Sequence, residues 1–392
     1  MTNTQKINGD HIKSARLFRG LSLSDLSNKT GITKQALSLY ENETIRPEIS
    51  KLVAIAQALD FPIEYFMSLD NFQVKTESTY FRSLLSTPKI ARTAQSVRVE
   101  FIAKIYEILI DYVDFPDRNF PDIAFSGRNA FSECADEEET SEIESIATQC
   151  RKFWGLGFGP IVNLQKTVES NGIIITSLFT DKDEIDAFSQ STIINGNSVY
   201  IIVLNSTKNN VRTRFDIAHE LGHIFLHPWS ENIEELSRQE FKERESQANK
   251  FAGAFLLPRE SFGNDVSHYP TKLEYYLHLK EKWNVSIQAM IYRAHQLKII
   301  STTQYQYLMR QISKRGWRSC EPYDRPFDIE KTLLQEAIEL LFSSGEMKPY
   351  DLMTALKSKG LYMRHEDVED LLSIERDSLK ETTSVPKLIR LK

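Results

Sequence analysis

The sequence predicts a multidomain fold: an all-α domain of five helices, an α+β domain with a small mixed sheet, and a helical C-terminal region. Short capped helical patterns fill residues 10–68, apolar runs separated by turns fill 172–205, and helical patterns dominate from 271 onward. A chain of 392 residues, 41% of them hydrophobic, can build two or three cores. The expected domains are 1–68, the five-helix domain; 69–150, a helical connector; 151–322, the α+β domain; and 323–392, the C-terminal region.

The composition indicates a cytoplasmic protein that has no membrane partner. The first residues lack the apolar core of a signal peptide, and no run approaches the roughly 18 apolar residues of a membrane span. Three scattered cysteines, Cys134, Cys150 and Cys320, show no paired spacing, which argues against a disulfide framework or a thiolate metal site. The net charge of −6 gives no overall attraction to nucleic acid, although an average can hide a local basic face.

Residues 10–68 have the spacing of a helix-turn-helix module. The run Ser22-Leu23-Ser24-Asp25 has the form of a capping box, with Asp in the place of the usual Glu or Gln. A turn at 30–32 leads to a third helix over 34–41, and a fourth helix begins after Pro47. The apolar positions expected to face the core in that fourth helix are Leu52, Val53, Ile55, Ala56 and Leu59.

This spacing resembles the Cro and phage-repressor (XRE) type of helix-turn-helix, whose third helix enters the major groove of double-stranded DNA. The resemblance implies DNA contacts from the start of that helix. Gln can pair with adenine, Lys with guanine or phosphate, and Thr at the helix N-terminus with phosphate. The candidate DNA-binding residues are Thr33, Lys34, Gln35 and Ser38.

A protein-binding role for this module stays open. Residues 1–68 hold eight Lys and Arg against seven Asp and Glu, whereas DNA-binding domains usually show a clearer basic surplus. Weak binding by a monomer would be remedied by a homodimer, which we therefore include among the expected partners.

Between the two folded units the sequence is less informative. A long helical pattern at 88–113 is expected to connect them, and the Tyr-Phe-Arg run at 80–82 suggests no chemistry. The acidic positions 136–139 are interpreted as a solvated helix start, where the helix dipole favours Asp and Glu.

The α+β domain is expected to begin with strands joined by a tight turn. Asn195-Gly196-Asn197 has the composition of a hairpin turn. Sheet edges can bind an extended peptide by adding it as an extra strand, so an edge within 185–205 is expected to form the wall of a cleft. The predicted strands are 172–176, 187–190 and 198–205.

The run His219-Glu220-Leu221-Gly222-His223 is the strongest chemical signal in the chain. On a helix, positions i and i+4 share a face, so His219 and His223 can bind one metal ion. Glu220 follows the first histidine, where its carboxylate can deprotonate a water held by zinc. Five residues with three fixed positions also occur by chance, so further context is needed.

An acidic residue on a second helix supplies that context. Glu245 begins a helical pattern that stops at Pro258, and Asn249 lies one turn later on the same face. Catalytic zinc usually has three protein ligands, so Glu245 is the candidate third ligand, with Glu243 as a nearby competitor. Asn249 can accept the free ring N–H of a ligating histidine and so fix its orientation.

Other polar residues near these motifs are assigned non-ligand roles. His227 is expected to close the C-terminus of the motif helix, where a donating side chain suits the free carbonyls. Trp229 stands where the one-helix metzincin pattern needs a ligand, which excludes that pattern. His268 and Tyr269 are candidates for stabilising an oxyanion, and a surface position is an equal alternative.

The runs 214–223 and 245–252 together resemble the signature of the ImmA/IrrE metallopeptidases, bacterial and phage enzymes that cleave transcriptional repressors. The resemblance covers about 150–322. It implies a zincin-like fold of the gluzincin type, with Zn²⁺ held by His219, His223 and Glu245 and with Glu220 as the general base. Gln247 departs from the pattern, because many relatives have an acid there.

The resulting hypothesis is a zinc endopeptidase that cleaves a repressor protein and carries its own DNA-binding module, in a stress, phage or mobile-element response. The alternative is a transcriptional regulator or antitoxin whose peptidase-like domain is a sensor without turnover. Residues 323–392 carry no motif, so they fit substrate recognition, dimerisation or a plain helical cap.

Overall fold

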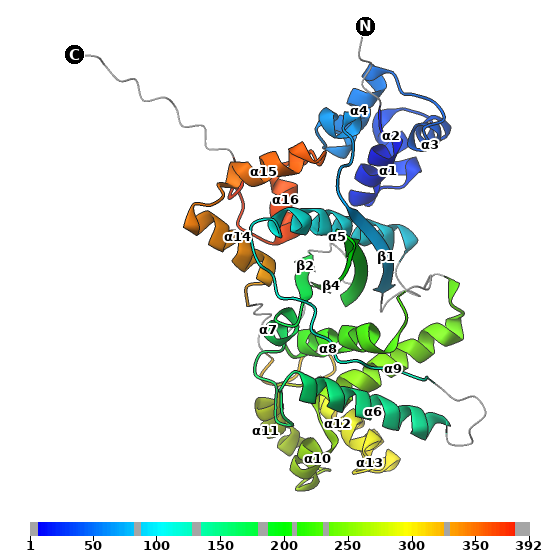
Figure 1. Cartoon of the computed structure of the whole chain (residues 1–392). Helices are drawn as coiled ribbons and strands as arrows, with labels where there is room; N and C mark the ends of the chain where they lie inside the picture. Colours follow the sequence, from blue (N-terminus) through cyan, green and yellow to red (C-terminus); the bar gives the residue numbers. More distant parts are fainter. Residues whose placement is uncertain are drawn as a thin grey trace. The chain divides into compact units, whose positions relative to one another are not determined.

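The computed structural model describes residues 7–81, 88–127, 135–178, 187–205, 210–229, 235–324 and 330–380. The chain forms two compact units that alternate along the sequence (Figure 1). Unit 1 comprises Met1–Val74, Pro88–Asp114 and Leu334–Lys392, and unit 2 comprises Lys75–Thr87 and Phe115–Leu333. The domain limits expected from the sequence stay predictions.

Unit 1 begins with the five short helices expected of a helix-turn-helix domain. Ser22 and Asp25 form the predicted capping box, and the hydroxyl of Thr33 accepts a hydrogen bond from the Ala36 amide. Gly31 joins the second and third helices with a φ of 70°, a conformation that glycine adopts without steric cost. The helices are α1 (Gly9–Phe18), α2 (Leu23–Thr30), α3 (Lys34–Glu41), α4 (Ile49–Leu59) and the 3₁₀ helix η1 (Ile63–Met67).

One expected core residue of this domain lies at the surface. Val53 is 36% exposed, whereas Leu52, Ile55, Ala56 and Leu59 are buried. The prediction for Val53 was wrong because it follows Leu52 directly, and adjacent helical positions point about 100° apart.

The C-terminal helices belong to unit 1. Arg19 at the end of α1 pairs with Asp367 at 2.5 Å, and Ser68 donates a hydrogen bond to the carbonyl of Gly360 at 2.7 Å. The long helix α5 (Lys89–Leu109), expected as a connector, also contributes to this unit, and its Glu107 pairs with Lys359 at 2.9 Å. The C-terminal helices are α14 (Leu333–Ser344), α15 (Pro349–Ser358) and α16 (His365–Leu372).

Unit 2 is built on a four-stranded mixed sheet in the order β1-β3-β4-β2. β2 pairs with β4 in parallel, and β3 pairs with β4 as the predicted antiparallel hairpin. Its turn residues Asn195 and Gly196 have φ values of 49° and 82°, as a two-residue turn of this hand requires. The strands are β1 (Val74–Phe81), β2 (Ile173–Leu178), β3 (Ala187–Ile194) and β4 (Asn197–Asn205).

The expectation of an exposed edge within 185–205 was wrong. β3 and β4 are the two inner strands, and the ends of the sheet are β1 and β2. β1 contains the Tyr-Phe part of the run that suggested no chemistry, and its pairing with a strand more than 100 residues away left no local signal in the sequence.

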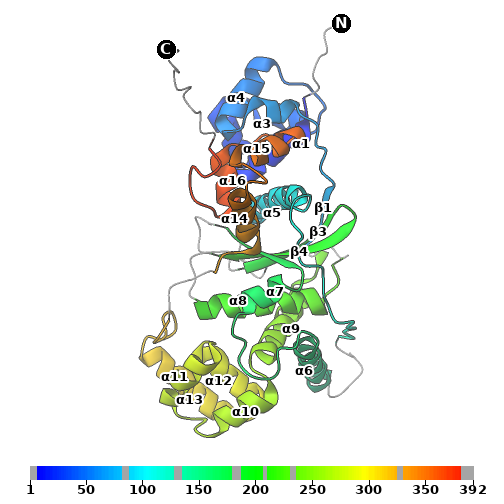
Figure 2. The ribbon, with the colours of Figure 1, turned by 60° about the vertical axis from the view of Figure 1, so that its left-hand side comes forward.

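Helices cover the sheet of unit 2 on one side. In Figure 2 the sheet lies above α8, and α9 and α6 lie below it, while α10 to α13 gather at the far end of the unit. The core between these layers includes Ile175, Ile202, Leu221, Phe251 and Phe255. The helices are α6 (Ala135–Phe153), α7 (Leu164–Glu169), α8 (Asn210–Leu226), α9 (Arg238–Leu256), α10 (Arg259–Ser267), α11 (Leu273–Trp283), α12 (Ile287–Gln296) and α13 (Thr302–Lys314).

Candidate metal centre

Two helices that pass very close to each other bring the proposed ligands together. A Cβ atom added to Gly222 on α8 would lie 2.9 Å from the Cα atom of Ala248 on α9. Only glycine permits this approach, because real Cβ atoms are not found so close to a neighbouring backbone. The contact sets α9 against the face of α8 that carries His219 and His223, and so places Glu245 beside them.

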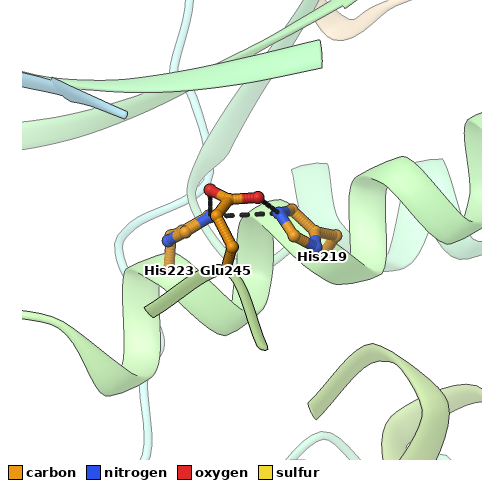
Figure 3. Close-up of side chains that lie close together, drawn as sticks. All are labelled: His219, His223 and Glu245. Carbon is orange, nitrogen blue, oxygen red and sulfur yellow. Dashed lines mark hydrogen bonds and ion pairs between the residues drawn. The ribbon is translucent and has the colours of Figure 1, made fainter. Parts of the chain in front are cut away.

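The side chains of His219, His223 and Glu245 point toward one another (Figure 3). The two histidine Nε2 atoms lie 3.0 Å apart. The Glu245 carboxylate oxygens lie 3.4 Å from Nε2 of His219 and 3.2 Å from Nε2 of His223. Both rings are buried, and 16% of the Glu245 side chain is exposed.

Asn249 lies where it can orient the first histidine. Its Oδ1 atom is 3.1 Å from Nδ1 of His219. Since Oδ1 is an acceptor, this contact puts the ring proton on Nδ1 and leaves a lone pair on Nε2.

His227, the first residue after α8, contacts the second histidine of the motif. Nδ1 of His227 lies 3.0 Å from Nδ1 of His223, and Nε2 of His227 lies 2.9 Å from Oε1 of Gln247. His227 therefore does not close the helix terminus, as its sequence position suggested. Its side chain turns back along the helix because i and i+4 share a face. Burial holds the pKa of His227 well below its usual value, so the ring is neutral at pH 7.

A buried glutamate, Glu139, determines which groups donate and which accept in the hydrogen bonds that link Gln247, His227 and His223. Glu139 on α6 accepts from Nε2 of Gln247 at 2.9 Å and from Lys250 at 2.7 Å. With its amide nitrogen committed to Glu139, Gln247 presents its oxygen to His227. His227 then donates from Nε2 and accepts at Nδ1, which places the proton of His223 on Nδ1 and frees its Nε2.

Glu139 is one of the acidic positions expected to be solvated. It is only 4% exposed, and that prediction was wrong because α6 packs on α9 in this unit. Positions 136–138 are exposed, as expected of a helix start.

The donor set fits a zinc ion. With both Nδ1 protons committed, the two Nε2 atoms and the carboxylate all turn lone pairs toward one another. Zinc held by bonds of 2.0–2.1 Å in a tetrahedron sets its ligand atoms about 3.3 Å apart, close to the three distances seen here. These are the one group of three or more His, Cys, Asp or Glu side chains within metal-binding reach in the described part of the chain.

The glutamate of the motif is held by the sheet. Ser189 on β3 donates a hydrogen bond of 2.6 Å to Oε2 of Glu220, and both side chains are fully buried. The bond fixes the rotamer of the carboxylate, and it is of the stronger, charge-assisted kind when Glu220 is ionised. No local pattern singles out Ser189, because its partner lies 31 residues further along the chain.

Tyr80 on β1 lies against the histidines. Its ring stacks on His223 with centroids 4.8 Å apart and on His227 at 5.8 Å. Its hydroxyl donates to the carbonyl of Pro228 at 3.1 Å and accepts from Arg244 at 2.7 Å. Only 1% of this tyrosine is exposed.

The remaining candidates near the motifs are placed elsewhere. Glu243 is half-buried and is not among the three converging side chains. Nδ1 of His268 lies 2.9 Å from the carbonyl of Asn264 within α10, and Tyr269 is half exposed and packs on Tyr275. These two residues have a surface placement.

The DNA-binding candidates lie together at the start of α3 in unit 1. Thr33, Lys34 and Gln35 are exposed, and Ser38 is half-buried. The buried pair Arg16 and Glu41, joined at 2.6 and 2.8 Å, ties α3 to α1. The start of α3 is thus a polar, exposed end on a fixed helix.

Comparisons with known families agree with this division. Residues 12–66 match the helix-turn-helix family, and residues 169–295 match the family described as the IrrE N-terminal-like domain, which is a peptidase family.

Curated relatives share a smaller part of the chain. The HTH-type transcriptional regulator YobD of Bacillus subtilis is 28% identical over 99 residues, which are 25% of this chain and 88% of that protein. HTH-type transcriptional regulators of Rickettsia prowazekii and Rickettsia conorii are each 43% identical over 58 residues, 15% of this chain. The match spans under half of the two Rickettsia proteins, at 45% and 46% of their lengths.

None of the helices in the described ranges is both long and apolar enough to cross a membrane.

Proposed function

We propose that this chain, which joins a helix-turn-helix domain to an IrrE N-terminal-like domain, is a zinc endopeptidase that cleaves a transcriptional repressor. The observation that carries the proposal is that the possible ligand atoms of His219, His223 and Glu245 all lie within 4.8 Å of one another. The buried Glu220 directly follows His219 in the chain. Two imidazoles and a carboxylate are a donor set of hydrolytic zinc sites.

The chain's own residues would divide the work of hydrolysis. Zinc bound by His219, His223 and Glu245 would act as a Lewis acid and lower the pKa of a water ligand to about 7. Glu220, held by Ser189, would take the proton of the attacking water and return it to the leaving amine. Asn249 and His227 would keep the two imidazole rings in the tautomer that binds metal.

The test uses zinc-loaded protein and the repressors encoded near its gene. We expect one defined cut in one of them. Glu220→Gln should retain zinc and lose cleavage by roughly 100-fold or more, as expected when a general base is removed. Glu243→Gln is the matched control, a Glu-to-Gln change outside the converging group. Equal cleavage by Glu220→Gln and the parent would refute the assignment of Glu220.

The proposed DNA-binding role rests on α3. A helix of this type reads base edges with its first exposed side chains, and here these are Lys34 and Gln35. Thr33 would serve phosphate contact and Ser38 a contact deeper in the groove. Sequence-specific binding to double-stranded DNA would then hold the peptidase near the operator of its substrate.

A homodimer would strengthen that binding. Ile49 and Val53, four residues apart on α4, are 56% and 36% exposed, and Ile45 before them is 51% exposed. We propose a second copy of this chain as the partner of these side chains, because paired half-sites are the usual way in which such modules gain affinity. Sedimentation of the parent and Ile49→Asp tests this; a parent that stays monomeric at micromolar concentration contradicts it.

A second candidate function is a regulator in which the peptidase-like domain is a sensor. The relatives named above are described as transcriptional regulators, which favours it. A chain that binds one zinc, changes its DNA affinity with zinc and cuts no repressor would establish this candidate instead.

A further inference from the structure

A strand from the start of unit 2 occupies the side of the sheet that a substrate would use. β1 lies next to β3, and β3 separates it from the β4-β2 pair. β3 is the strand that holds Glu220 through Ser189, so its outer side is the edge nearest to the proposed catalytic base. Extended peptides bind to sheet edges by adding a strand, and here β1 takes that position.

The sequence of β3 is more typical of a strand whose neighbour can be exchanged than of one that is permanently paired on both sides. Strands that are buried on both faces usually have near-continuous apolar runs, as β4 does at Val199-Tyr200-Ile201-Ile202-Val203-Leu204. β3 instead carries the polar run Ser189-Gln190-Ser191-Thr192, each of which is fully buried. A strand of this composition resembles an edge that meets water or a polar peptide backbone.

The contacts between β1 and β3 are also polar. Gln190 bonds to Thr79 at 3.0 Å and to Thr76 at 3.3 Å, and Ser191 donates to Glu77 at 2.6 Å. When the strands separate, each of these bonds is exchanged for a bond to water, so its net contribution is a fraction of its strength in isolation, and the bond to the Glu77 carboxylate contributes most.

Tyr80 is a large, buried side chain that anchors β1. Its ring packs against the rings of His223, His227 and Trp229. Its hydroxyl donates a hydrogen bond to the carbonyl of Pro228 and accepts one from Arg244. A site lined by aromatic rings, with the Arg244 donor and the Pro228 acceptor beside the hydroxyl, fits the phenol ring of a tyrosine. An entering peptide that replaces β1 would find this place open to its own side chain.

We propose that β1 is an internal stand-in for the substrate strand, and that the substrate is an extended segment presenting a tyrosine-like aromatic side chain in the place of Tyr80. This inference rests on the proposed function and adds its substrate class and its regulation. The peptidase is then closed in the structure described here and opens when β1 leaves β3.

The position of β1 in the sequence suits a regulated strand. The segment Lys75–Thr87 is flanked on both sides by segments of unit 1, Met1–Val74 and Pro88–Asp114. The DNA-binding unit is therefore joined to β1 through both of its ends. A segment tethered in this way competes at an effective concentration of about millimolar, so a free peptide must bind well to displace it.

The test measures binding and needs no cleavage. The probe is a fluorescein-labelled peptide with the sequence of Phe72–Phe81, and its anisotropy is followed with full-length protein carrying Glu220→Gln to prevent turnover. The double substitution Thr79→Pro with Tyr80→Pro is designed to detach β1. Successive N–H groups of an edge strand point alternately toward and away from its neighbour, so one of two adjacent prolines must remove a hydrogen bond to β3. Tyr80→Ala is the milder variant, and Tyr269→Ala, a half-exposed tyrosine of the same unit, is the matched control.

We expect the detached variant to bind the probe with a Kd at least tenfold lower than that of the Glu220→Gln protein. Tyr80→Ala should lower the Kd as well, by a smaller factor. Tyr269→Ala should bind the probe with the Kd of the Glu220→Gln protein. A probe with alanine in the place of Tyr80 should bind the detached variant at least tenfold more weakly. Equal affinity of every protein for the probe overturns the proposal for β1, and affinity indifferent to the tyrosine overturns the substrate class.

Two further readouts keep the result decisive. Circular dichroism shows whether the detached variant is folded, and if it is not, Tyr80→Ala decides. Loss of repressor cleavage affects the peptidase proposal alone, because the binding pattern above requires no hydrolysis. If cleavage does occur, protein with Tyr80→Ala and an intact Glu220 should cut faster than the parent.

Discussion

Nδ1 of His227 lies 3.0 Å from Nδ1 of His223, so His227, just after α8, contacts the ring atom of His223 that faces away from Glu245. A neutral His227 that donates to Gln247 can only accept from His223. The tautomer that leaves Nε2 free to bind metal is thereby set from outside the three ligands.

Replacing this histidine tests that role. His227→Phe keeps an aromatic ring but removes the acceptor, and the zinc affinity should fall by roughly 10-fold to 100-fold, as for other contacts behind a ligand. His227→Gln can still accept from Nδ1 and should restore part of the affinity. Competition with a chromogenic chelator gives the affinities, with the exposed His268→Phe as control. If the glutamine variant is no better than the phenylalanine one, the hydrogen bond is not the cause.

The close passage of α8 and α9 at Gly222 makes a second prediction. In Gly222→Ala the new Cβ would lie 2.9 Å from a backbone atom of Ala248, so the helices must separate and move Glu245 away from the histidines. We expect a loss of roughly 1–3 kcal/mol in the free energy of unfolding, together with weaker zinc binding.

Gly253→Ala on α9 is the control for this change. Its Cβ would lie 3.6 Å or more from its neighbours, which is ordinary contact, and alanine favours a helix by roughly 0.5–1 kcal/mol over glycine. Urea unfolding and zinc titration are measured for both variants. Similar zinc affinity in the two would mean that the helix contact does not position Glu245.

The hydrogen bond from Ser189 to Glu220 makes a prediction that depends on the peptidase function. Ser189→Ala should lower kcat by roughly tenfold or more, because a hydrogen bond to a charged group contributes about 1.5–3 kcal/mol. Zinc stoichiometry should not change, since Ser189 is not a ligand. Ser177→Ala, a buried serine on β2 of the same sheet, should keep the parent rate. An unchanged kcat in Ser189→Ala would show that the sheet does not orient Glu220.

The exposed residues at the start of α3 are predicted to carry the DNA contacts. Lys34→Ala with Gln35→Ala should weaken binding to DNA from upstream of its own gene by roughly tenfold or more, as each base contact contributes about 1–3 kcal/mol. Lys13→Ala, an exposed lysine on α1, is the control. Mobility-shift titrations at fixed salt give the affinities. A double variant that binds like the parent would remove α3 as the recognition helix.

Features that depend on the spacing of a few neighbouring residues could be predicted from the sequence. The capping box at Ser22 and Asp25, the hairpin turn at Asn195 and Gly196, and the helical spacing of His219 and His223 each span a few residues. Helix and turn geometry follow from short-range backbone preferences, so these patterns can be read without knowledge of the fold.

The tertiary structure decided which distant segments meet. Only the fold placed β1 beside β3, buried Glu139 under Gln247, and brought the C-terminal helices to unit 1. Strand neighbours and buried polar pairs depend on contacts between segments far apart in the chain, for which the periodicity of either segment alone carries no information. The sequence by itself therefore determined the metal-binding chemistry that we propose, and the tertiary structure decided which side chains orient it and which strand lies beside β3.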